Sequence, residues 1–277
     1  MLKIKRKRRF FSVYRRPSWK KITAILALVV VAVTGAYMFF SQDGSFQDAL
    51  PVQLPFTGER KVPIYYVETE EKKAAFSFDA CWGATYTPDI LEILKENNID
   101  TTYFLTGYWV ENHPDMVKKI DRAGHEIGNH TYSHPHLNNL SREEIKAEVE
   151  RVDAMITELT GNKPELFRPP FGEYSNKVVE AVHEQGHMPI QWSIDSLDWK
   201  EMGKEPMVNR VKDNLHPGAI VLFHNNGRYT KEALPEIIDY VKGEGYEIVP
   251  ISELLYRENY YIDSITGAQV KIEGPKE

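Results

Sequence analysis

From about residue 62 onward, short β-like runs alternate with amphipathic helical stretches. Alternation of this kind predicts an α/β domain with a largely parallel sheet. About seven strand–helix pairs within roughly 190 residues suit a small or irregular barrel, although an open, doubly wound sheet fits the same pattern. The predicted strands are residues 74–78, 102–105, 126–128, 166–168, 188–192, 219–223 and 246–249, and the predicted helices are residues 88–97, 114–123, 141–160, 176–185, 207–214 and 233–242.

The N-terminal part of the chain predicts a membrane anchor. Residues 22–40 are 19 uncharged, mostly apolar residues, and a helix rising about 1.5 Å per residue would carry them across a hydrocarbon core of about 30 Å. A cleaved signal peptide is the alternative, but its apolar region is usually about 7–15 residues long. We therefore expect an uncleaved anchor at 22–40, a linker at 41–61, a folded domain at 62–262 and a loose tail at 263–277.

Charge is distributed unevenly along the chain. Of the 34 Lys and Arg residues, ten lie within residues 1–21, whereas all 40 Asp and Glu residues follow, so the rest of the chain has a formal charge of −16. The basic head predicts a cytoplasmic N-terminus, a single membrane pass and an exported domain. An acidic body repels phosphate backbones, which argues against nucleic acid as a partner.

Two histidines, His130 and His134, stand four residues apart before Pro135. On one face of a helical turn, this spacing would let two imidazoles share a divalent metal. Isolated pairs of this kind also arise by chance as surface or capping residues.

A second motif places Asp79 at the end of the predicted strand 74–78, where α/β folds carry catalytic groups. The carboxylate could serve as a general base or a ligand, or could cap the following helix. Cys81, the only cysteine, and Trp82 are by default buried packing residues.

Arg168, in the rigid sequence Arg-Pro-Pro-Phe-Gly, could bind a carboxylate, although such a sequence is also an ordinary stiff turn.

Two further segments are weak signals when taken singly. Residues 193–199 read Ser-Ile-Asp-Ser-Leu-Asp-Trp, and residues 220–224 read Ile-Val-Leu-Phe-His. His224 ends a strand and has the pKa range of a general acid near neutral pH. A lone histidine at a strand end is more often structural.

These five segments, in this order over about residues 71–256, resemble the NodB-homology domain of carbohydrate esterase family 4, the polysaccharide deacetylases. The resemblance implies an irregular (β/α)7 barrel that removes acetyl groups from N-acetylated glycans with a divalent metal, usually zinc. It also assigns roles to residues of this chain: His130 and His134 as metal ligands, Asp79 as base, Arg168 as its tether, the Phe171 N–H as oxyanion donor, Asp198 as the partner of the acid His224, and Trp199 and Leu222 as groove residues.

One departure concerns the metal. Most members of the family place a metal-binding Asp directly after the base, where this chain has Ala80. Two histidines alone make a poor zinc site, and Asp79, Cys81 or His136 could complete it. The Ala80 variation, with Trp82 following, resembles the sporulation-associated subgroup.

The sequence therefore predicts metal-assisted hydrolysis of acetamido groups in cell-wall glycan, by a domain tethered outside the membrane. The alternative is a catalytically silent, membrane-tethered glycan-binding protein of the same fold, which Ala80 favours.

Overall fold

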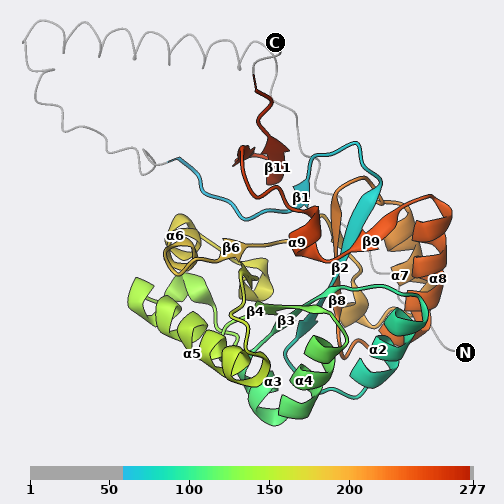
Figure 1. The fold of residues 1–277 in the computed structure, drawn as a ribbon, viewed down its shortest axis with the longest axis horizontal. Helices are drawn as coiled ribbons and strands as arrows, with labels where there is room; N and C mark the ends of the chain where they lie inside the picture. Colours follow the sequence, from blue (N-terminus) through green and yellow to red (C-terminus); the bar gives the residue numbers. More distant parts are fainter. Residues whose placement is uncertain (1–58, 275–277) are drawn as a thin grey trace, which may run out of the picture. The chain divides into compact units, whose positions relative to one another are not determined.

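The structure, a computed structural model, describes residues 59–274, in which strands and helices alternate as predicted (Figure 1). The strands are β1 (Tyr66–Val67), β2 (Lys73–Ala80), β3 (Thr102–Leu105), β4 (Glu126–Asn129), β5 (Leu166–Phe167), β6 (Met188–Pro189), β7 (Ile194–Asp195), β8 (Ala219–His224), β9 (Glu247–Val249), β10 (Tyr260–Ile262) and β11 (Ala268–Lys271). The helices are α2 (Thr87–Glu96), α3 (Gly107–Asn112), α4 (Pro114–Arg122), α5 (Arg142–Thr160), α6 (Asn176–Glu184), α7 (Lys204–Lys212), α8 (Thr230–Gly243) and α9 (Ile251–Leu254).

Parallel pairing forms a ring around the centre of the domain. β2 and β8 pair from Ala74↔Ala219 to Asp79↔His224, and parallel neighbours continue from β2 through β3, β4 and β5 to β6. β7 pairs with the edge of β8 opposite β2. Because β6 and β7 lie in one segment, residues 188–195, the series returns to β8. An isolated parallel bridge between Ile64 and Ile190 strengthens this junction. The domain is therefore barrel-like rather than an open sheet.

Side chains of β2 alternate between two environments, as the two-residue period of a strand requires. Ala74, Phe76, Phe78 and Ala80 belong to the apolar cluster that α2, α4, α5, α7 and α8 cover. Ala75 belongs to a second cluster with Phe104, Leu166 and Ile220 of other strands, inside the ring. The interior becomes polar at the carboxyl ends of the strands, where Asp79 and His224 lie.

Local signals explain where several helices begin. The Ser141 side chain accepts a hydrogen bond from the Glu144 N–H, and the Glu144 carboxylate accepts one from the Ser141 N–H, so α5 begins with a capping box. α2 and α4 begin with proline in the first turn, where a missing N–H costs nothing. The sequence did not predict the short α3, whose cap is the Thr106 hydroxyl.

The prediction of a loose tail after residue 262 is wrong. Residues 268–271 form β11, which pairs in parallel with β1 and antiparallel with β10. Gln269 is buried, and its amide bonds both the N–H and the C=O of Tyr256 at 2.9 Å. The sequence Ala-Gln-Val-Lys is too short to show a period, and its conformation depends on pairing with β1, about 200 residues away in the sequence. The predicted linker also ends early, since the Lys61 N–H donates to Asn176 of α6.

Within residues 59–274, no helix is long and apolar enough to cross a membrane. The predicted anchor, residues 22–40, lies outside the described residues.

Replacing Gln269 by Leu should destabilise the domain, because it leaves the Tyr256 N–H and C=O without their buried partners. We expect the free energy of unfolding to fall by about 1–3 kcal/mol, measured by urea denaturation of the full chain. Ile265→Ala, at a side chain that is 86% exposed, is the control and should change it by less than about 0.5 kcal/mol. An equal effect of the two substitutions would contradict the assignment of β11 to the folded domain.

Candidate active site

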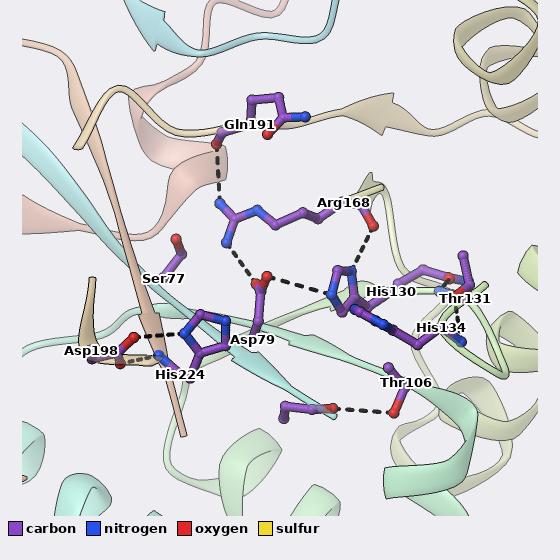
Figure 2. A network of polar contacts seen from close by, with 12 residues as sticks. Ser77, Asp79, Thr106, His130, Thr131, His134, Arg168, Gln191, Asp198 and His224 are labelled. Carbon is purple, nitrogen blue, oxygen red and sulfur yellow. Dashed lines mark hydrogen bonds and ion pairs between the residues drawn. The ribbon is translucent and has the colours of Figure 1, made fainter. Parts of the chain in front are cut away.

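Asp79 and Arg168 form a buried ion pair at the carboxyl end of the ring (Figure 2). Arg168 Nη1 donates to Asp79 Oδ1 at 2.8 Å, and Arg168 Nη2 donates to the Gln191 carbonyl at 3.1 Å. The guanidinium carbon also lies 4.1 Å from the centre of the Phe104 aromatic ring, in the interior of the barrel. Burial alone would raise the pKa of Asp79, but the charges of Arg168, His130 and His224 lower it below its usual value. Asp79 is therefore ionised at neutral pH.

His224 and Asp198 form a second pair beside the first. His224 Nδ1 lies 2.7 Å from Asp198 Oδ1, and Asp198 Oδ2 accepts hydrogen bonds from the His224 N–H and the Thr230 hydroxyl. Gly227 permits this approach, since a Cβ there would lie 2.8 Å from Asp198 Oδ2. Burial alone would lower the pKa of His224, but Asp198 raises it above its usual value. The ring nitrogen Nε2 then holds a proton to a higher pH than an ordinary histidine does.

His130 and His134 lie together, with ring centroids 4.9 Å apart, but not on a helical turn. The predicted turn is wrong because Thr131 and His134 both adopt left-handed backbone angles, with φ of 65° and 55°. Pro135 disfavours the right-handed helical conformation for the residue before it. Burial lowers the pKa of both histidines, that of His134 to about 3. Both rings are therefore neutral, the form that binds metals.

A buried polar network that the sequence did not predict supports this loop. The Asn129 side chain accepts from the Thr131 N–H and donates to Asp153 Oδ1 at 2.8 Å. Asp153 of α5 lies 2.9 Å from His187 Nε2 through its other oxygen. The Thr131 hydroxyl in turn accepts from the His134 N–H. Only the fold brings these residues, which lie up to 58 positions apart in the sequence, behind the two histidines.

Besides Asp79, the sequence offers Cys81 and His136 as further metal ligands. The structure places Cys81, and not His136, beside the two histidines. The donor atoms of Cys81, His130 and His134 all lie within 4.8 Å of one another. His136 instead lies 2.9 Å from Glu173 and stacks on Phe171. Burial, with the nearby charge of Asp79, raises the pKa of the Cys81 thiol.

The predicted site residues other than the tether Arg168 line one open pocket of about 600 Å³, a volume typical of ligand sites. Leu222 is buried in its wall, whereas Trp199 and Phe171 are more than half exposed. Phe171 has φ of 59°, a conformation rare for a bulky residue and often found at functional sites. Cys81 also lines the pocket, and Trp82 lines it with 65% of its surface exposed. The default assignment of Trp82 as a buried packing residue was therefore wrong, and Cys81 is partly buried with its side chain at the pocket.

Comparison with known proteins identifies the family of the chain. The sequence model of the polysaccharide deacetylase family matches residues 66–190. The chain is 32% identical to the peptidoglycan-N-acetylmuramic acid deacetylase PdaA of Bacillus subtilis, over 75% of this chain and 80% of that protein. It is 37% identical to a peptidoglycan-N-acetylglucosamine deacetylase of Bacillus cereus, over 68% of this chain and 91% of that protein. The chain belongs to the polysaccharide deacetylase family.

Family membership classes the chain with hydrolases of acetamido carbon–nitrogen bonds, as the sequence predicted. Solved structures of the same fold include a CE4 family pseudoenzyme from Bacillus anthracis, with a TM-score of 0.68 and 34% identity over 76% of this chain and 73% of that one. A mutant of that pseudoenzyme with restored enzymatic activity has a TM-score of 0.68 and 38% identity over 70% and 71%. The same fold therefore occurs in a protein described as a pseudoenzyme and in its mutant with restored enzymatic activity.

We expect Asp198→Asn to lower the pKa of His224, because the carboxylate that raises it becomes neutral. Titration of the histidine ring signals by NMR measures this pKa, and His224→Gln assigns the signal. Asp195→Asn is the matched control and should cause a smaller decrease, since Asp195 makes the weakest named contribution and no hydrogen bond to the ring. An unchanged His224 pKa in Asp198→Asn would contradict the account of this pair.

Proposed function

We propose that this chain is a metal-dependent N-deacetylase of peptidoglycan, with Asp79 as catalytic base and His224 as catalytic acid. The observation that supports it best is the pairing of Asp79 with Arg168 and of His224 with Asp198 on neighbouring strands of one pocket. The named activities of the relatives, on N-acetylglucosamine or N-acetylmuramic acid of peptidoglycan, support the substrate class.

The donor set fits a divalent metal. His130 Nδ1 lies 2.7 Å from the Arg168 carbonyl, which keeps the proton on Nδ1 and directs Nε2 toward the pocket. No ring nitrogen of His134 makes a hydrogen bond to any of residues 59–274. His130 and His134 would hold the ion, and zinc is a metal that imidazole ligands suit. Polarisation of the acetyl carbonyl and of a water molecule is the chemistry that such an ion supplies when bound.

The protein groups account for the proton transfers. Asp79, ionised and oriented by Arg168, accepts a proton from the attacking water. The Phe171 N–H stabilises the oxyanion that forms on the acetyl oxygen, a contribution of about 3–4 kcal/mol for one donor. His224 Nε2 donates its proton to the sugar nitrogen as the carbon–nitrogen bond breaks. Trp199 and Leu222 bound the space for the sugar.

A second candidate function is a catalytically silent glycan-binding protein. Ala80 in place of the family's metal-binding Asp favours it, and so does the similarity to a pseudoenzyme. We favour the enzyme because both pairs are intact and shift the pKa values of Asp79 and His224 in opposite directions, which is how active sites run acid and base chemistry together.

Asp79→Asn and His224→Gln should each reduce acetate release from peptidoglycan or chitin oligomers by about 10²–10⁴-fold, because each removes a proton-transfer group. The assay measures acetate from the purified full chain. EDTA should abolish the activity of the unaltered chain, and added metal should restore it. Ile265→Ala, far from the pocket residues in the sequence and exposed, should retain full activity.

Unaltered rates in either pocket variant would remove that residue from the mechanism. Retention of glycan without acetate release, before and after EDTA, would establish the silent binding protein instead.

The proposed location is the outer face of the cell membrane, with residues 22–40 as anchor. The full chain should then stay in the membrane fraction after alkaline carbonate extraction, whereas residues 59–277 alone should be released. Extraction of the full chain by carbonate would contradict the anchor. A role in sporulation, implied by the resemblance to the sporulation-associated subgroup, stays a prediction about when the chain is made.

A further inference from the structure

The direction of side chains at the end of β2 determines which of them can reach the two histidines. Asp79 lines the pocket, whereas Ala80 is fully buried in the outer apolar cluster with Phe78. Cys81, one residue further, lines the pocket again. The order inward, outward, inward is the two-residue period of a strand continued by one residue. Ala80 therefore packs in the apolar cluster and offers no donor atom, whereas the Cys81 side chain lines the same pocket as the two histidines.

Backbone contacts hold this alternation in place. The Ala80 carbonyl accepts hydrogen bonds from the Thr106 N–H at 3.1 Å and from the Thr106 hydroxyl at 3.3 Å. Ala80 also pairs with Leu105 in the parallel ladder between β2 and β3. Rotation of residue 80 into the pocket would break these contacts.

Cys81 completes a compact group of donors. Its sulfur and one ring nitrogen from each of His130 and His134 lie within 4.8 Å of one another. Two donors bound to one tetrahedral zinc at about 2.0–2.3 Å lie roughly 3.5 Å apart, so small side-chain rotations suffice to bring all three onto one ion. Asp79 is not a member of this group: its Oδ2 lies 3.4 Å from His130 Nε2, and Arg168 holds its Oδ1 at 2.8 Å.

We infer that the Cys81 thiolate is the third protein ligand of the metal at this site, in place of the carboxylate that most of the family carries at the preceding residue. The inference rests on the proposed function for the presence of a metal. The resulting ligand set, one sulfur and two imidazole nitrogens, is one that zinc accepts in catalytic sites with a fourth position open. On binding, the thiol releases its proton to solvent and the sulfur–metal bond forms.

This assignment resolves the conflict that Ala80 creates. With sulfur as the third ligand, Asp79 remains paired with Arg168 and available as a base. A soft thiolate also favours zinc or cobalt over magnesium or calcium, which prefer oxygen ligands.

Cobalt(II) bound to the full chain provides a direct test, because a cobalt–thiolate bond gives an intense near-ultraviolet charge-transfer band that oxygen and nitrogen ligands do not. Cys81 is the only cysteine of the chain, so such a band can come from no other residue. We expect the band at a stoichiometry of one cobalt per chain. Bound cobalt should also protect the thiol from alkylation by iodoacetamide.

Three variants separate ligation from folding. Cys81→Ala should lose the band and weaken cobalt binding by about 100-fold or more, since even loss of an outer hydrogen-bond partner of a ligand costs about 10–100-fold. Cys81→Asp should lose the band but retain cobalt, because a carboxylate at the same position can replace the thiolate. His134→Ala should weaken binding like Cys81→Ala while the thiol remains. Thermal unfolding of each metal-free variant checks that the domain is folded.

Stoichiometric cobalt binding without the band would overturn the inference, and so would an unaltered cobalt affinity in Cys81→Ala. Acetate release would then show whether the proposed function still stands. The band without acetate release on any glycan would leave Cys81 as a ligand and reject the deacetylase. Failure of the full chain to bind cobalt would overturn the inference as well.

Discussion

The pocket depends on one contact, the buried ion pair between Asp79 and Arg168. Arg168 is fully buried inside the ring, and its guanidinium joins the ends of β2 and β5 to the segment after β6 while it lies on the Phe104 ring. A buried guanidinium is costly without a partner, and loss of one member of such a pair typically costs about 3–5 kcal/mol. The same contact therefore closes the interior of the barrel and fixes the position and charge of the carboxylate that faces the pocket.

The surroundings shift the pKa values of two titratable groups on neighbouring strands in opposite directions. Arg168 lowers the pKa of Asp79, and Asp198 raises the pKa of His224, each against the effect of burial. Asp79 therefore loses its proton at a lower pH, and His224 keeps its proton to a higher pH, than ordinary groups of their kind. Parallel pairing of β2 with β8 brings these two groups side by side, so the register of the sheet is part of the chemistry of the site.

The support for the two histidines lies away from the pocket. Asn129 joins Asp153 of α5 to the left-handed turn at Thr131, and Thr131 holds the His134 N–H. The loop is thus fixed by a hydrogen-bonded network in the protein interior, where polar groups without partners are expensive. A rigid loop of this kind holds the two histidines in place before any ion binds, and this reduces the entropy lost on binding.

The sequence by itself determined the parallel α/β class, the strand ends that carry Asp79 and His224, and the start of α5, because periodicity, strand ends and capping residues act over a few neighbouring positions. It left open whether the sheet closes, and it was wrong about β11, the turn at His134 and the exposure of Trp82. Ring closure and β11 depend on pairs far apart in the sequence, such as Ile64 with Ile190 and Tyr66 with Ala268. Likewise, only the tertiary structure decided that Cys81 rather than His136 joins the histidine pair, because the backbone held by Thr106 sets the direction of the side chains after β2, while Glu173 and Phe171 hold His136 away.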